Sequence, residues 1–122
     1  MLVVDDNKDA GDTLELLLLS MGQQVRNVYN GPSAITIAKS FEPDIVLLDI
    51  GMPEMNGYEV ARAIRSSAPP IDAVLVALTG WGQDADRARS DEAGFQYHFV
   101  KPISESVLLA LLTEVAAKRR QT

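Results

Sequence analysis

The chain has 122 residues, of which 47% are hydrophobic and 23% are charged, a composition that fits one globular domain and excludes a disordered chain. Its net charge of -6 argues against a nucleic-acid-binding surface. The basic cluster at residues 118–120 stands at the end of a predicted helix, where we expect it to interact with the negative end of the helix dipole and not with DNA. The absence of cysteine excludes disulfides and thiolate metal sites, and no apolar run approaches the roughly 18 residues of a membrane span. We therefore expect a cytoplasmic domain that contacts neither nucleic acid nor membrane.

Short apolar runs, each about as long as a strand, recur along the chain. The predicted strands are residues 2–4, 24–28, 44–48, 73–78 and 97–100. The run 45–48 is apolar at every position, which is typical of a strand buried on both faces of a parallel sheet. The first run is shorter than a usual central strand, so we expect that its beginning is truncated and that the chain was excised from a longer protein.

Segments with helical periodicity separate these runs. One helix face is predicted from Ala10, Leu14, Leu17, Leu18 and Met21, a second from Ala34, Ile35, Ala38 and Phe41, and a last from Val107, Leu108, Leu111, Leu112 and Val115. Gly22 and Gly94 stand where helices should end. The helix predicted near residues 84–93 has only alanines to bury, so we expect it to be weakly held and able to move. Alternating strands and helices predict an α/β fold with a doubly wound parallel sheet.

Polar side chains gather at the predicted carboxyl ends of the strands. Asp5 and Asp6 follow the first strand, Asp49 the third, Thr79 the fourth and Lys101 the fifth. Open parallel sheets bind ligands at this edge, so the three carboxylates should converge if the first and third strands are neighbours. Each residue alone could be a helix cap, a turn residue or a solvated lysine, but the whole set favours a site.

Three converging carboxylates repel one another unless a cation is present. Oxygen ligands with room for water and phosphate favour Mg²⁺, or Mn²⁺, over zinc or copper. A carboxylate beside that metal, here Asp49, can attack phosphorus and form an aspartyl phosphate. The metal and Lys101 would neutralise charge on the phosphoryl oxygens, and Thr79 would donate a hydrogen bond to them.

Four motifs follow one another in the sequence: VVDDN from residue 3, LLDIGMPEMNGYEV from residue 47, ALTGW from residue 77 and EAGFQYHFVKPI from residue 92. With these motifs the chain resembles, over essentially its whole length, the receiver domains of bacterial two-component response regulators, in particular those attached to hybrid sensor histidine kinases. The resemblance implies one receiver domain over residues 1–122. It also implies a flavodoxin-like fold with five helices and a five-stranded parallel sheet in strand order 2-1-3-4-5.

The resemblance implies a metal-dependent phosphoacceptor site. Asp49 would be the phosphoacceptor, Asp6 a direct Mg²⁺ ligand, and Asp5 a ligand acting largely through metal-bound water. The backbone carbonyl of Gly51 would complete the protein ligands. The phosphodonor would be a phosphohistidine on a histidine kinase or a phosphotransfer domain. The sequence leaves open whether the chain is a monomer or a weak dimer, because the surface of the last helix could serve a partner, a second copy or the parent protein.

The remaining matched residues imply a conformational switch. Thr79 would be the switch hydroxyl and Lys101 would pair with the phosphoryl group. Pro53 and Gly57 would shape the loop after the acceptor, and the bond before Pro102 would be cis. Phosphorylation would draw Thr79 and Lys101 inward and shift the face formed by residues 84–115.

Three positions depart from the family pattern. His98 occupies the place usually held by a switch tyrosine or phenylalanine, and it could rotate toward Thr79 or simply lie half-exposed at a strand end. Gly51 and Trp81 flank the acceptor where the family varies, and we expect them to tune the phosphoryl lifetime. The Trp81 indole could cover the phosphate and limit attack by water.

We expect a switch that assists its own phosphorylation and dephosphorylation and is not a turnover enzyme. Three other functions are alternatives. An Asp-nucleophile phosphatase usually has a second acid two residues after the nucleophile, where this chain has Gly51. A flavin- or nucleotide-binding domain would need a glycine-rich loop where Asp5, Asp6 and Asn7 stand. A degenerate receiver acting only as an interaction module remains an alternative, although the acceptor, acid pair, hydroxyl and lysine are all present.

Overall fold

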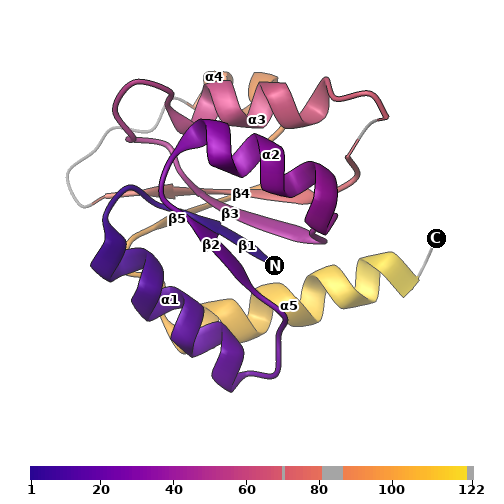
Figure 1. Ribbon diagram of the computed structural model, residues 1–122. Coiled ribbons are helices and arrows are strands. Elements are labelled where there is room, and N and C mark those ends of the chain that lie inside the picture. Colours follow the sequence, from indigo (N-terminus) through magenta and orange to yellow (C-terminus); the bar gives the residue numbers. More distant parts are fainter. Residues whose placement is uncertain (70, 81–86, 121–122) are drawn as a thin grey trace.

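A computed structural model describes residues 1–69, 71–80 and 87–120. Strands and helices alternate strictly in that part of the chain (Figure 1). The strands are β1 (Leu2–Val4), β2 (Arg26–Val28), β3 (Ile45–Asp49), β4 (Val74–Thr79) and β5 (Tyr97–Val100). The helices are α1 (Lys8–Ser20), α2 (Gly31–Phe41), α3 (Gly57–Arg65), α4 (Arg87–Ala93) and α5 (Glu105–Arg120).

The five strands form one sheet in the order β2-β1-β3-β4-β5, and every neighbouring pair is parallel. This confirms the predicted doubly wound fold, and strand bounds differ from the predicted ones by no more than two residues. The strand order reverses between β1 and β3, which are hydrogen-bonded neighbours. Their carboxyl ends therefore form the crevice in which such sheets bind ligands.

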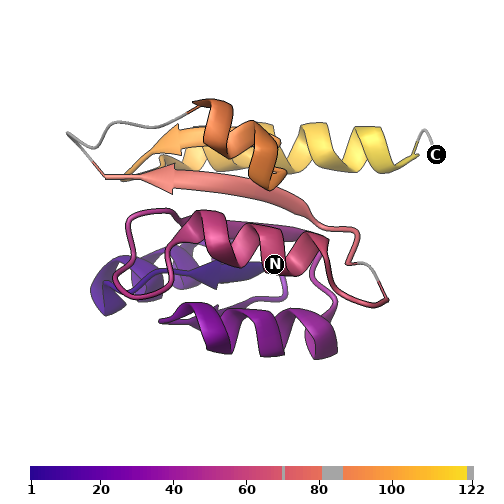
Figure 2. The ribbon, with the colours of Figure 1, turned by 90° about the horizontal axis from the view of Figure 1, so that it is seen from above.

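Helices cover both faces of the sheet and enclose two separate cores. Helices α2, α3 and α4 lie side by side over one face, and α1 and α5 cover the other (Figures 1 and 2). The first core includes Val46, Leu48 and Ile64, and the second includes Leu47 and Leu108. Alternate side chains of β3 enter opposite cores, which explains why residues 45–48 of this strand are all apolar.

Local signals in the sequence set the helix ends. Asn7, Asn30 and Asn56 cap the first turns of α1, α2 and α3, each through a side-chain oxygen that accepts a backbone N–H. The predicted terminators Gly22 and Gly94 have φ angles of 84° and 95°, the left-handed region that glycine tolerates. Among the helices of the described residues, none has both the length and the apolar composition needed to cross a bilayer.

The fourth helix differs from its prediction in one respect. The structure has α4 at Arg87–Ala93, and residues 84–86 of the predicted range lie outside the described residues. Alanines are not its only buried residues, because Ser90 is 3% exposed beside the buried Ala93. The helix therefore buries a small polar side chain where a longer apolar one would hold it more strongly.

Candidate phosphoacceptor site

The three predicted carboxylates meet at the carboxyl edge of the sheet. Asp5 directly follows β1, Asp49 ends the neighbouring β3, and one carboxylate oxygen from each of Asp5, Asp6 and Asp49 lies within 4.8 Å of the others. Asp5 and Asp49 are 2% and 4% exposed, whereas Asp6 is exposed to solvent. The cluster therefore has two buried acids and one acid at its mouth.

Lys101 connects the two buried acids. Its Nζ lies 3.2 Å from Asp5 Oδ2 and 3.3 Å from Asp49 Oδ2. The other oxygen of each carboxylate accepts a backbone N–H from two residues further on, Asn7 for Asp5 and Gly51 for Asp49, both at 2.9 Å. Both carboxylates are thus held by a backbone donor on one side and by the ammonium on the other.

Charge crowding and burial shift the protonation of the site. Burial raises the pKa of Asp5, and the negative charge of Asp49 adds to the increase against the opposing pull of the Asn7 N–H and Lys101. Loss of hydration also raises the pKa of Asp6. A hydrogen bond with Asp49 and the negative charge of Asp49 raise it further. Burial alone would lower the pKa of Lys101, but Asp49 and Asp5 outweigh it and raise that pKa. The lysine therefore stays charged, while Asp5 and Asp6 hold their protons to a higher pH than free carboxyls.

The donor set fits a hard divalent cation. Three carboxylates beside one ammonium leave an excess of two negative charges in a partly buried place. All the candidate side-chain ligands are oxygens, and the exposed Asp6 leaves one side open to water. These are the ligand type and openness that Mg²⁺ prefers.

The loop after the acceptor packs tightly against it. A Cβ placed on Gly57, the first residue of α3, would lie 2.6 Å from Ile50 Cα and 2.8 Å from the Asp49 carbonyl oxygen. Glycine is therefore required there for α3 to approach Asp49 so closely. Gly51 and Pro53 are exposed on the same loop.

The predicted switch residues lie on the two neighbouring strands β4 and β5. Thr79 is 1% exposed, and its Oγ1 donates to the carbonyl oxygen of Phe99 at 3.4 Å. His98 is half-buried and lines a hollow of about 260 Å³ with Ser90 and Asp91 of α4. The Lys101-Pro102 bond is cis, as the resemblance implied. The predicted phosphate cover, Trp81, lies outside the described residues.

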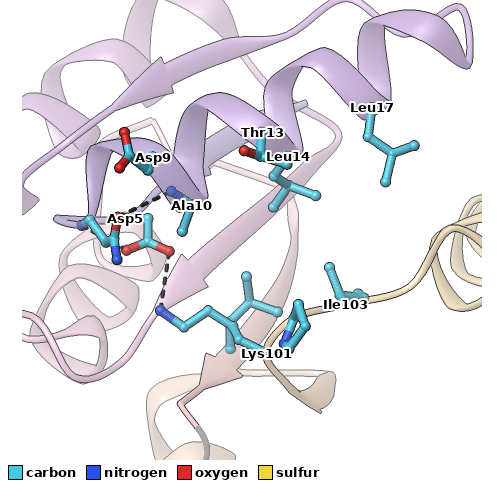
Figure 3. Close-up of a pocket in the computed structure, with 11 residues that line it drawn as sticks. Asp5, Asp9, Ala10, Thr13, Leu14, Leu17, Lys101 and Ile103 are labelled. Atoms are coloured by element: carbon cyan, nitrogen blue, oxygen red, sulfur yellow. Dashed lines mark hydrogen bonds and ion pairs between the residues drawn. The ribbon is translucent and has the colours of Figure 1, made fainter.

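A groove beside the site was not predicted from the sequence. It has a volume of about 450 Å³ and runs from Asp5 and Lys101 between α1 and the loop after β5. Figure 3 shows Leu14 and Leu17 on one side of it and Ile103 on the other. The periodicity of α1 marks these leucines as core residues, so no local signal distinguishes the groove from the buried face.

The parallel sheet, with an acidic cluster and a lysine at its carboxyl edge, defines the chain as a doubly wound α/β domain with a candidate metal and phosphoryl site at the point where strand order reverses. Residues 1–113 match the response regulator receiver domain family, and the chain belongs to that family. Receiver domains are phosphoacceptor switches of two-component signalling rather than classical enzymes.

Individual relatives agree with this assignment. The chain is 30% identical to protein PilH of Pseudomonas aeruginosa over 117 residues, 96% of this chain and 97% of that protein. A receiver domain of a signal transduction histidine kinase from Syntrophus aciditrophicus has 27% identity and a TM-score of 0.84, covering 99% of this chain and 92% of that one. Chemotaxis protein CheY4 of Vibrio cholerae shares the fold at 24% identity and a TM-score of 0.84, covering 93% and 95%.

Proposed function

We propose that this receiver accepts a phosphoryl group on Asp49 from a phosphohistidine and changes the surface of α4, β5 and α5 in response. The observation that carries the proposal is the meeting of Asp5, Asp6 and Asp49 with Lys101 bound between the two buried acids. A solvated lysine or an isolated helix cap would not produce this arrangement. The degenerate-receiver alternative would leave this set of groups without a use.

Each residue would have a separate task. Asp49 Oδ would form a bond to phosphorus while the bond from phosphorus to the donor nitrogen breaks. Asp5, Asp6, Asp49 and the carbonyl of Gly51 would hold Mg²⁺, which when bound supplies positive charge to the phosphoryl oxygens. Lys101, already 3.3 Å from Asp49, would pair with a phosphoryl oxygen.

The groove next to the site would receive the donor protein. Asp49 is almost fully buried, so an imidazole must come in from the open side of the cluster. The groove joins that side at Asp5 and Lys101, and beyond the polar Asn7, Asp9 and Thr13 it is lined by apolar residues of α1, β4 and the β5–α5 loop. Its apolar lining fits the side of a partner helix.

The signal would leave through Thr79 and β5. Thr79 rests against the carbonyl oxygen of Phe99, and a phosphoryl group on Asp49 would offer it a charged acceptor instead. Release of that contact would free β5 next to His98, whose side of the strand faces α4 across the hollow. The shift would select between existing conformations of α4 and β5.

Incubation with acetyl phosphate and Mg²⁺, followed by intact-mass measurement, tests the proposal. Attack by Asp49 on phosphorus would expel acetate and add one phosphoryl group to the chain. We expect the mass gain in the wild type, and none in Asp49→Asn or when Mg²⁺ is chelated. A gain of equal size in Asp49→Asn would show that the acceptor lies elsewhere.

A further inference from the structure

Polar side chains of α4 and β5 face a common space on one side of the sheet. Ser90 and Asp91 line the hollow of about 260 Å³ from α4, and His98 lines it from β5. Tyr97 and Phe99 pack against the core on the other face of the sheet, so the alternation of side chains along β5 places His98 on the α4 face. A movement of either element therefore changes how Ser90 and His98 meet.

The hydroxyl of Ser90 is buried in an unfavourable way. Ser90 is 3% exposed, and its Oγ has no hydrogen-bond partner among the described residues. A buried hydroxyl of this kind is costly, because it has lost its bonds to water and has gained none in return. Both ring nitrogens of His98 are buried as well. The resting arrangement of α4 and β5 thus leaves a polar group that another arrangement can satisfy.

His98 is the best placed of the polar side chains on this face to satisfy Ser90. Gln96 is exposed, and its Oε1 already accepts a backbone N–H and the guanidinium of Arg65. Asp91 is exposed and directly follows Ser90 on α4, and adjacent residues of a helix do not face each other. An imidazole nitrogen and a hydroxyl can each donate or accept, so His98 and Ser90 are chemically complementary.

We propose that Ser90 and His98 form a hydrogen bond in the phosphorylated receiver that is missing in the resting one. This inference rests on the proposed function, in which Thr79 leaves the carbonyl oxygen of Phe99 and frees β5. The shift of β5 brings the imidazole to the Ser90 hydroxyl, and the bond then holds α4 against the strand. Because only one state has the bond, it favours that state. Ser90 is a positioning residue, since it acts through His98.

The chain has one histidine, so NMR can follow the His98 ring directly. Its ring nitrogen resonances are recorded at one fixed pH before and after addition of acetyl phosphate and Mg²⁺, and intact mass is measured on the same samples. We expect the resonance of one nitrogen to shift on phosphorylation in the wild type, and Ser90→Ala to lose most of that shift. Ser40→Ala is the matched control, because Ser40 is exposed on α2 and bonds within its own helix, and it should keep the shift.

Hydrogen exchange tests the energetic effect in each state. In the unphosphorylated protein, Ser90→Ala should exchange α4 amides no faster than the wild type, because the hydroxyl that it removes has no bond to lose. After phosphorylation, the same variant should exchange them about two- to tenfold faster, the factor of one hydrogen bond. Ser90→Thr keeps the hydroxyl and should behave like the wild type. In a His98→Phe background, Ser90→Ala should have no further effect.

The inference and the proposed function fail in different ways. A wild type that gains no phosphoryl mass would overturn both. A normal mass gain would leave the proposed function standing, and three results would then overturn the bond alone. These are faster α4 exchange in unphosphorylated Ser90→Ala, equal exchange of the phosphorylated wild type and Ser90→Ala, and an undiminished histidine shift in Ser90→Ala. Circular dichroism checks that each variant is folded, and His98→Phe gives an independent measure of the same bond.

Discussion

At the scale of single residues, Lys101 determines the resting state of the site. Without a metal, its ammonium is the positive charge that lies between Asp5 and Asp49 and lets two buried carboxylates coexist. Among the described residues, Lys101 forms ion pairs with Asp5 and Asp49 but not with Asp6. The charge of the exposed Asp6 is stabilised more by solvent. The acids therefore destabilise the metal-free fold when all are ionised, and a divalent cation should relieve that cost.

Stabilisation by Mg²⁺ should depend on pH. The pKa values of Asp5 and Asp6 are raised above 3.8, so the folded chain holds more protons than the unfolded one between 3.8 and the raised values. Stability of the metal-free protein through these groups then falls as pH rises across that window. Mg²⁺ binding must displace the protons, so its effect should be largest above the window and be lost on acidification.

Thermal denaturation with and without Mg²⁺ across pH checks this expectation. Asp6→Asn removes one ligand at the mouth of the cluster and should reduce the Mg²⁺-induced rise in melting temperature at neutral pH. A rise of the same size at every pH would contradict the assignment of Asp5 and Asp6 to the metal site.

Gly57→Ala should reduce both stability and phosphorylation. The added Cβ would press on Ile50 and on the Asp49 carbonyl, so we expect a loss of about 1–3 kcal/mol in unfolding free energy, although alanine favours helices. Gly22→Ala is the comparison, since its Cβ meets nothing within 4 Å and only its φ of +84° is unfavourable. Urea unfolding should show losses in both variants, but only Gly57→Ala should slow mass gain from acetyl phosphate.

At the scale of elements, Arg65 joins the end of α3 to the segments that directly precede β4 and β5. Its guanidinium donates to the carbonyl oxygens of Ala73 and Gly94 at 2.7 and 2.9 Å, and to Gln96 Oε1 at 3.0 Å. Gln96 Oε1 also accepts the N–H of Leu75, at the start of β4. The C-terminal end of α4 and the start of β5 are thereby anchored, so movement of α4 should begin at its other end.

Arg65→Met should destabilise the fold by about 2–4 kcal/mol, because it leaves partly buried carbonyl oxygens without their charged donor. Arg62→Met, on the exposed side of the same helix, should change stability by no more than about 0.5 kcal/mol. Urea denaturation measures both. Equal effects of the two substitutions would remove the argument for an anchor.

At the scale of the whole molecule, stability is concentrated in the centre of the sheet. Strand β3 is buried throughout and divides the two cores, whereas α4 has seven residues and buries Ser90 and Ala93 among its described side chains. The central strand should therefore open only with the whole fold, and α4 should open locally. The proposed switch needs this contrast between a fixed strand that carries Asp49 and a surface that can respond.

Hydrogen exchange should show this difference directly. Amides of β3 should exchange only by global unfolding, and those of α4 about a hundredfold faster or more. Phosphorylation with acetyl phosphate and Mg²⁺ should alter protection in α4 and β5 and leave β3 unchanged. Exchange in α4 as slow as in β3 would argue against α4 as the responsive element.

Much of the fold could be predicted because its signals are local. Apolar runs of strand length, helical spacing at Leu14 and Leu18, and Gly22 after α1 each act within a few residues, and the strands and helices are confirmed. The error at α4 concerned burial of Ser90, which depends on the helix's neighbours and not on its own sequence. The acidic residues were found because they directly follow strands or end them.

The sequence by itself determined which residues could build an acidic site and which elements would carry them, since apolar periodicity and turn residues act at short range. Only the tertiary structure decided that Lys101 lies between Asp5, 96 residues away, and Asp49. It alone brought Arg65 to Gly94 and opened the groove beside α1. Those contacts depend on the order of the strands in the sheet and on the packing of the helices against it. No single segment of the chain determines either of these.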